Sequence, residues 1–120
     1  MMIPIKTAHL DNIIKIEEES FNNPWSYESF LNEINNSVSS NWVYIKKNKT
    51  LGYLFGWYID KDFQINNIAV ISSHQRKGIA REMINNIIKV LDLLTITLEV
   101  SVANKSAILL YENMGFKKNG

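Results

Sequence analysis

Apolar residues in the first third of the chain recur every three or four positions, the spacing that places them on one face of a helix. A short strand around Ile3 to Lys6 is expected to precede two such helices, with Pro24 marking the break between them. Thr7 is expected to cap the first helix and Ser26 the second, because a side-chain oxygen there accepts a hydrogen bond from the first turn. The expected buried side chains are Leu10, Ile13, Ile14 and Phe21 in the first helix and Tyr27, Phe30, Leu31 and Ile34 in the second.

β-branched and aromatic runs replace this spacing between Ser40 and Ile71. Such residues favour an extended chain. Two hydrophilic breaks, Asn48-Lys49 and Asp60-Lys61-Asp62, interrupt the runs and have the composition of tight turns. The segment is therefore predicted to form three consecutive antiparallel strands, near residues 41–47, 51–59 and 63–71.

Helical spacing returns after Ile71, gives way to a strongly β-prone segment at residues 95–102, and returns once more before the end. A strand, a helix and a further strand in this order predict a parallel pair with a right-handed connection. Gly115 suits the left-handed residue that ends a helix. One α/β domain over residues 1–120 is expected, with the element order β α α β β β α β α. The expected apolar faces are Ile79, Met83, Ile84, Ile87, Ile88 and Leu91 in the first of these helices, and Ala107, Leu110, Tyr111 and Met114 in the second.

Composition and charge exclude several classes of function. The 13 basic and 12 acidic residues give a net charge of +1, so bulk electrostatics favours neither nucleic acid nor a membrane as partner. Cysteine is absent, which excludes a thiolate metal site and a cysteine nucleophile. His9 and His74 are too few for a histidine metal site, so no metal is expected. The first residues lack the features of a signal peptide and no apolar run approaches a membrane span, so a cytoplasmic protein is expected.

A small basic turn, Gln75-Arg76-Lys77-Gly78-Ile79-Ala80, separates the apolar run Ile68-Ala69-Val70-Ile71 from the helix that follows. The first N–H groups of a helix have no internal partner and lie at the positive end of its dipole, so this geometry binds phosphate. The turn lacks the further glycines of a Walker loop or a dinucleotide fingerprint. Basic turns also precede helices without any ligand, so an ordinary structural turn remains an alternative. Gly78 and Ala80 are small enough to let an anion approach the backbone. Positive charge around the turn comes from Arg76, Lys77 and Arg81.

Two residues in the second half of the chain suit acid–base chemistry. Glu99 lies in the middle of the predicted strand 95–102, where it shares a face with Thr95, Thr97 and Ser101; a solvent-exposed strand face is the alternative explanation. Tyr111 lies on the apolar face of the last helix, where a core aromatic is the alternative. A carboxylate that accepts a proton and a phenol that donates one, beside a phosphate-bearing ligand, suit acyl transfer to an amine. Direct attack by the amine needs no covalent nucleophile.

Several motifs resemble, in order along the chain, those of the GNAT acetyltransferase superfamily, and most closely those of its ribosomal-protein alanine N-acetyltransferase branch. The resemblance runs from about residue 3 to residue 118, and the branch rests mainly on Pro24-Trp25-Ser26 and Glu99. It implies the GNAT fold, a mixed, mostly antiparallel sheet with helices on both faces. The matching segments are Phe21-Asn22-Asn23-Pro24-Trp25-Ser26, Asn67-Ile68-Ala69-Val70, Gln75-Arg76-Lys77-Gly78-Ile79-Ala80, Leu98-Glu99-Val100, Asn104-Lys105-Ser106-Ala107-Ile108 and Tyr111-Glu112-Asn113-Met114-Gly115-Phe116.

The resemblance implies a role for each matching residue. Ile68, Ala69 and Val70 match the strand that holds the pantetheine arm of acetyl-CoA and polarises the thioester carbonyl. The segment from Arg76 to Arg81 matches the pyrophosphate loop, with Ala80 where the family commonly has glycine. Asn104 resembles the residue that contacts coenzyme A beside the last helix. Glu99 then corresponds to the general base that takes the amine proton, and Tyr111 to the general acid that protonates the departing thiolate.

The resemblance also implies the substrates: acetyl-CoA as cosubstrate and a protein N-terminus as acceptor, with N-terminal alanine of a ribosomal protein as the expected case. An α-amino group, with a pKa of about 7.7–8.0 against about 10.4 for lysine, needs little help to lose its proton. Trp25 is expected either to pack or to line the acceptor channel. Acetylation of a small amine is one alternative. A catalytically idle acetyl-CoA-binding module is the other, because the chain stops at Gly120, where the family typically continues into further strands, and a short C-terminus would expose a sheet edge.

Overall fold

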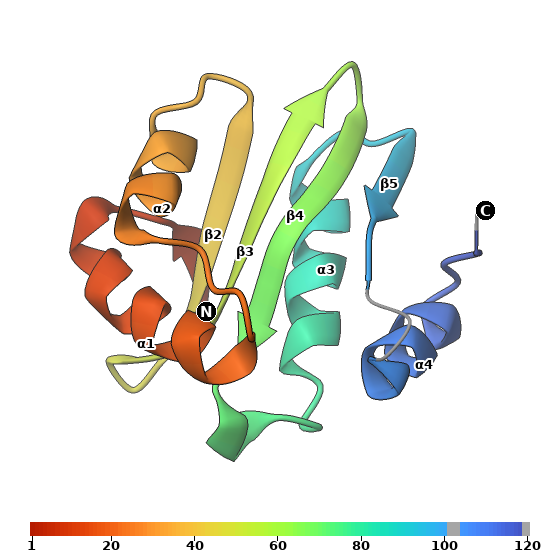
Figure 1. Ribbon diagram of the computed structural model, residues 1–120. Coiled ribbons are helices and arrows are strands. Elements are labelled where there is room, and N and C mark those ends of the chain that lie inside the picture. Colours follow the sequence, from red (N-terminus) through yellow and green to blue (C-terminus); the bar gives the residue numbers. More distant parts are fainter. Residues whose placement is uncertain (101–103, 119–120) are drawn as a thin grey trace.

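Five strands form one sheet with helices on both of its faces (Figure 1). This computed structural model describes residues 1–100 and 104–118. The predicted order of helices and strands is confirmed, and two short 3-10 helices, η1 and η2, are added to it. In chain order the elements are β1 (Met2–Pro4), η1 (Thr7–His9), α1 (Leu10–Ser20), α2 (Tyr27–Ile34), β2 (Ser39–Lys46), β3 (Lys49–Ile59), β4 (Asp62–Val70), η2 (Ser72–His74), α3 (Ile79–Val90), β5 (Thr95–Leu98) and α4 (Lys105–Asn113).

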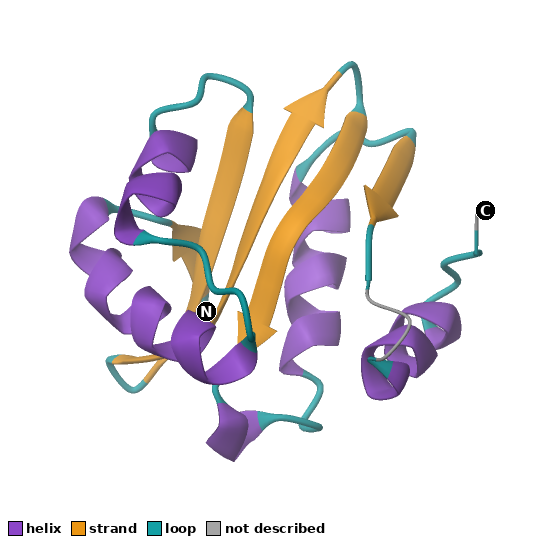
Figure 2. Ribbon diagram, viewed as in Figure 1, coloured by secondary structure: helices purple, strands orange, loops and turns teal. Residues whose placement is uncertain are grey.

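The strands lie in the order β1-β2-β3-β4-β5 (Figure 2). The pairs β1–β2, β2–β3 and β3–β4 are antiparallel, and the pair β4–β5 is parallel. The three consecutive antiparallel strands and the parallel pair are therefore confirmed. Two-residue turns join β2 to β3 and β3 to β4, and all four turn residues have positive φ: 53° and 62° at Lys47 and Asn48, 50° and 64° at Asp60 and Lys61. Positive φ at both central residues matches the twist of the flanking strands, so both breaks are hairpin turns. Their bounds differ from the prediction, because Lys49 already belongs to β3 and Asp62 to β4.

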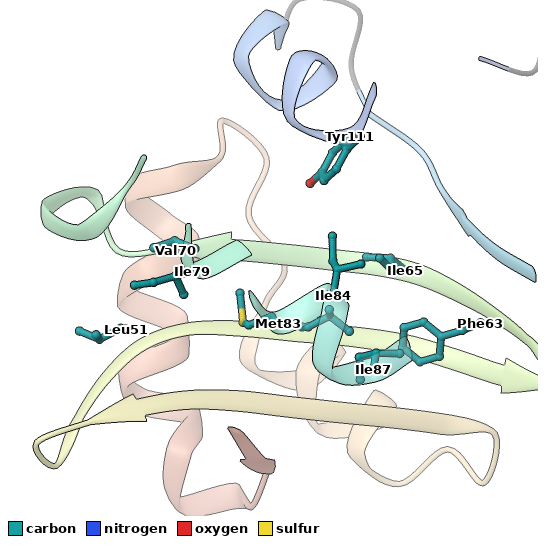
Figure 3. Close-up of a cluster of buried hydrophobic side chains, with 10 residues drawn as sticks. Leu51, Phe63, Ile65, Val70, Ile79, Met83, Ile84, Ile87 and Tyr111 are labelled. Carbon is teal, nitrogen blue, oxygen red and sulfur yellow. The ribbon is translucent and has the colours of Figure 1, made fainter. Parts of the chain in front are cut away.

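Two hydrophobic clusters pack against opposite faces of the sheet. On one face α1 and α2 contribute Leu10 and Phe30, both fully buried. On the other face α3 contributes Met83 and Ile87, and Tyr111 from α4 joins the same cluster (Figure 3). Burial of each such apolar side chain contributes about 1.5–3 kcal/mol. Helices therefore pack against both faces of the sheet.

The predicted cap of α2 is confirmed, and that of α1 is wrong. Ser26 Oγ accepts a hydrogen bond from Ser29 N at 3.1 Å. Thr7 instead begins η1, and His9 is the N-cap of α1 without a side-chain hydrogen bond. The tighter 3-10 turn supplies its own bond, from His9 N to Lys6 O at 2.9 Å, which satisfies a donor that a side-chain cap would have served.

Three residues that the helical spacing predicted to be buried are exposed in the structure. Phe21 is 37% exposed because it is the C-cap of α1, where the chain turns extended and leaves the helix. Tyr27 and Ile88 are each 48% exposed, because the face of each helix that contacts the sheet is narrower than the predicted apolar face. Leu91 packs against the core as predicted, although it follows the last residue of α3.

β5 is shorter than predicted. It spans Thr95–Leu98, so Glu99 follows the strand rather than lying in its middle, and residues 101–102 of the prediction lie outside the described residues. Pairing with β4 stops at Ile65↔Leu98. A bulge in β4 explains this stop, because the register between β3 and β4 shifts there and leaves Asn66 without an opposite residue, and bulges bend the strand that carries them. The alternation of more and less exposed side chains nevertheless continues to Val100.

Candidate active site

β4 has a free edge beyond its bulge. Past Ile65 the described residues place no strand beside it on the β5 side, while its other side pairs with β3 up to Val70. The predicted residues Ile68, Ala69 and Val70 lie in this stretch. Unpaired N–H and C=O groups along a strand edge bind an extended chain through main-chain hydrogen bonds. The edge is therefore suited to an elongated ligand.

The turn from Gln75 to Gly78 leads from β4 into the start of α3. Arg76 and Gly78 have positive φ of 62° and 84°. Gln75 Nε2 donates to the carbonyl oxygen of Val70 at 3.1 Å, which fixes the turn to the end of β4. Gly78 is the N-cap of α3 and offers the first N–H groups of the helix no side-chain acceptor. These donors and the positive end of the helix dipole are placed to bind an anion.

Positive charge gathers around this turn from two parts of the chain. Partial burial of the ring lowers the pKa of His74, and the nearby charges of Lys77, Lys49 and Lys46 lower it further. Lys46 ends β2 and Lys49 begins β3, so this hairpin adds charge that the sequence pattern did not place here. Clustered positive charge favours a phosphate-bearing ligand at the turn.

Arg81 lies on the first turn of α3 and lines a cavity of about 490 Å³ that it shares with Tyr44 of β2 and Glu82. A hydrogen bond to Glu82, then burial and the charge of the same carboxylate, raise the pKa of Tyr44. Acidic and basic side chains thus line the same cavity. Of the predicted cofactor residues, Gly78 and Arg81 line it.

Tyr111 points from α4 toward β4 and α3 (Figure 3). Its side chain is 9% exposed and belongs to the same cluster as Val70 and Ile79. The ring lies edge-on to Phe116, with 5.8 Å between the centroids. Burial raises the pKa of its hydroxyl, so the hydroxyl keeps its proton at neutral pH. The structure therefore places the predicted acid in the hydrophobic cluster on the α3 face of the sheet.

Glu99 is exposed and directly follows β5. Its neighbours Leu98 and Val100 both pack against the cluster on the α3 face. Because successive side chains of an extended chain point to opposite faces, Glu99 is directed toward the face that α1 and α2 cover. The predicted base and the predicted acid therefore lie toward opposite faces of the sheet.

A cavity of about 600 Å³ lies on the α1 face, between the loop after α1 and the bulge of β4. Glu17 is the only ionisable side chain among its described lining residues. Trp25 both packs and lines the cavity, since its ring lies 5.2 Å from that of Phe30. Two buried polar atoms of the lining, Ser20 Oγ and Asn66 Nδ2, have no hydrogen-bond partner in the described part of the chain. The lining residues are Glu17, Ser20, Phe21, Asn22, Asn23, Trp25, Asn66, Asn67 and Asn104.

Glu17 is a candidate that the sequence pattern did not single out. It is 1% exposed and accepts hydrogen bonds from the hydroxyl of Tyr53, from Asn67 Nδ2 at 2.8 Å and from Trp25 N at 2.9 Å. Burial, then the hydrogen bond to Glu17 and its charge, raise the pKa of Tyr53. A signal was present, because Glu17 follows Leu10 by seven residues and so lies on the apolar face of its helix, where a charged residue is unusual.

Asn104, predicted to contact coenzyme A, caps α4. Its Oδ1 accepts a hydrogen bond from Ala107 N at 3.2 Å, and its side chain also lines the 600 Å³ cavity. A cap of this kind stabilises a helix by about 0.5–2 kcal/mol. Asn104 therefore fixes the start of the helix that carries Tyr111, while its contact with the cofactor stays a prediction.

Within residues 1–100 and 104–118, no three His, Cys, Asp or Glu side chains gather in a way that would hold a metal ion. The helices in these same ranges are all too short or too polar to cross a bilayer.

Comparison with known proteins gives consistent findings. A family model described as the acetyltransferase (GNAT) family matches residues 10–116. A Bacillus subtilis protein provisionally named as a ribosomal protein bS18-alanine N-acetyltransferase is 29% identical, over 97% of this chain and 80% of its own length. An N-alpha-acetyltransferase of Saccharolobus solfataricus is 30% identical over 91% of this chain and 75% of its own length. The crystal structure of the Escherichia coli ribosomal-protein-S18-alanine N-acetyltransferase superposes with a TM-score of 0.92, at 26% identity over 100% of this chain and 79% of that one.

Proposed function

Since the chain belongs to the GNAT family of acetyltransferases, we propose that it transfers an acetyl group from acetyl-CoA to the α-amino group of a protein N-terminus. The observation that carries this proposal is that the free edge of β4 leads to the uncapped start of α3, and that the hydrophobic cluster which includes both regions also includes Tyr111. N-terminal alanine of a ribosomal protein is the proposed acceptor, because similar proteins bear that name. Residues 1–120 act as one domain in this proposal, and the reaction takes place in the cytoplasm.

An elongated acetyl-CoA molecule fits along the described residues, from the start of α3 to the free edge of β4. The pyrophosphate fits the start of α3, where free N–H groups meet the charge of Arg76, Lys77 and Arg81. The pantetheine arm fits the edge formed by Ile68, Ala69 and Val70, where the N–H groups that face away from β3 polarise the thioester carbonyl. The remaining predicted cofactor contacts are Gly78, Ile79 and Ala80 at the turn and Asn104 at the start of α4.

Two side chains move protons in the proposed reaction. Glu99 takes a proton from the acceptor amine, whose nitrogen then attacks the thioester carbonyl carbon. As the carbon–sulfur bond breaks, Tyr111 donates its hydroxyl proton to the departing sulfur, and the extra proton of the new amide nitrogen passes to the tyrosine oxygen and restores the hydroxyl. The hydroxyl of Tyr111, whose pKa is raised by burial, is protonated at neutral pH, as a proton donor must be. Their placement toward opposite faces also fits, since the amine and the cofactor then approach from different sides.

The lining of the 600 Å³ cavity favours a peptide acceptor over a polyamine. Its single described carboxylate, Glu17, already accepts three hydrogen bonds, whereas recognition of a polycation calls for several free anions. The remaining described lining consists of amides, one hydroxyl and aromatic rings. Such groups form hydrogen bonds with a peptide main chain.

A panel of amines tests the proposed function directly. We expect mass spectrometry to find acetyl on the α-amino group of Ala-starting peptides, because this amine loses its proton more readily than lysine, and none on lysine side chains or polyamines. Acetylation of a polyamine, an aminoglycoside or a free amino acid alone would replace the proposal with small-molecule transfer. Thermal stabilisation by acetyl-CoA with no acetylated product from any amine would identify a binding module instead.

A further inference from the structure

One carboxylate joins three separate segments of the chain. Glu17 Oε1 accepts hydrogen bonds from the Tyr53 hydroxyl on β3 and from Asn67 Nδ2 on β4. Glu17 Oε2 accepts one from the backbone N–H of Trp25, in the loop between α1 and α2. Helix, loop and two neighbouring strands therefore meet at this side chain.

A buried carboxylate at position 17 destabilises the fold more than an apolar side chain would. Removing a charged group from water destabilises the fold unless hydrogen-bond donors replace its hydration. Neighbouring inward positions of α1 hold Ile13 and Ile16, both buried, so an aliphatic side chain suits this face of the helix. The three donors to Glu17 are all neutral, and each hydrogen bond to a charged acceptor is stronger than an ordinary one. The arrangement thus fixes where the three donors lie.

Two of these donors belong to opposite walls of the 600 Å³ cavity. Trp25 lies on the loop wall, where its ring packs against Phe30 and Phe55 at 5.2 and 5.9 Å. Asn67 lies on the strand wall, directly before Ile68 at the start of the free edge of β4. The Glu17 carboxylate therefore sets the distance between the loop and the strand edge.

We propose that Glu17 is a positioning residue for the acceptor: it holds the loop of Trp25 and the side chain of Asn67 at the spacing that the acceptor needs. This inference rests on the proposed function, because the acceptor is the amine whose acetylation is proposed above. Glu17 itself moves no proton in the reaction. Its carboxylate accepts hydrogen bonds from three donors, and its effect reaches the acceptor through Trp25 and Asn67.

Glu17→Gln is the main test, because it keeps the shape of the side chain and removes the charge. An amide cannot accept from all three donors, so the loop is expected to shift. The KM for an Ala-starting peptide should rise and kcat/KM should fall by roughly tenfold to a hundredfold, the effect of a small misplacement of reacting groups. The Kd of acetyl-CoA, measured by calorimetry, should stay unchanged. Amide hydrogen exchange at Trp25 should become faster, which reports the lost hydrogen bond without any need for activity.

Two further variants complete the test. Glu18→Gln makes the same chemical change at the adjacent, exposed residue and should leave KM and exchange as in the parent. Tyr53→Phe removes one donor with little change of volume and should raise the acceptor KM in the same direction. A merely structural role would lower the folded fraction and hence the apparent kcat, but it would not move KM, which does not depend on the concentration of folded enzyme.

The outcomes separate this inference from the proposed function. If the KM for the acceptor is the same in Glu17→Gln as in the parent, the positioning role is wrong, whatever the stability of the variant. If the parent acetylates a different amine, the proposed acceptor is wrong and the same KM comparison is made with that amine. If the parent acetylates none, the proposed function fails, and an unchanged Trp25 exchange rate in Glu17→Gln would separately refute the positioning role.

Discussion

Glu99→Gln is expected to lower kcat for acetylation of an Ala-starting peptide at neutral pH by roughly a hundredfold to ten-thousandfold, the usual contribution of a general base. Glutamine keeps the size of the side chain but cannot accept the amine proton. Glu99 is exposed and follows the last residue of β5, so the change should leave packing and folding intact. Steady-state kinetics with saturating acetyl-CoA measures the effect.

The pH dependence sharpens this prediction. An α-amine with an ordinary pKa of about 8 deprotonates unaided as the pH rises, so the deficit of Glu99→Gln should shrink above that pH. Acetyl-CoA at about 100 times its Kd should still stabilise the variant by roughly 2.7 kcal/mol, since its binding groups are elsewhere. Glu112→Gln, an exposed carboxylate on α4, is the matched control and should behave as the parent. A Glu99→Gln protein as fast as the parent at neutral pH would remove the base from the mechanism.

Tyr111→Phe is expected to lower kcat by a comparable factor, about a hundredfold or more for loss of a general acid. The departing thiolate must take a proton at neutral pH, because an ordinary thiol has a pKa of about 8.5. Phenylalanine preserves the ring that packs beside Phe116 and within the cluster of Val70 and Ile79. Stability should therefore change little while turnover is lost.

Tyr27→Phe is the control for this change, because Tyr27 is 48% exposed and lies on α2. Rapid mixing of enzyme, acetyl-CoA and peptide should show that the loss in Tyr111→Phe lies in the chemical step and not in product release. A variant with parental kcat would show that the hydroxyl of Tyr111 does not protonate the sulfur. Its burial would then be explained by packing alone.

Much of the fold follows from local patterns. The hairpin turns at Lys47-Asn48 and Asp60-Lys61 and the buried face of α3 were predictable, because turn chemistry and helical spacing act over a few residues. The end of β5 could not be predicted in this way. It depends on the bulge at Asn66, a feature of the register between β3 and β4, and nothing in the β5 sequence encodes that register. The exposed position of Phe21 likewise depends on where α1 ends.

Some residues of the candidate site were likewise predictable from local patterns, and others were not. The turn before α3 and Tyr111 were predictable, since a basic glycine turn and an aromatic on an apolar helix face are local signals. The Glu17 network was not, because its bonds to Tyr53 and Asn67 span 36 and 50 residues. Only the anomaly of a carboxylate on the apolar face of α1 marks it in the sequence. The lysines of the β2–β3 hairpin reach the turn only once the sheet has formed.

A crystal structure with coenzyme A and an Ala-starting peptide would show whether the cofactor and the acceptor amine meet between Glu99 and Tyr111. We expect the pyrophosphate at the first N–H groups of α3 and the sulfur within hydrogen-bond reach of Tyr111 Oη, about 3 Å or slightly more. The peptide α-amine should lie within reach of the Glu99 carboxylate, directly or through one water. Coenzyme A bound away from the free edge of β4, or a sulfur remote from both side chains, would contradict the proposed mechanism.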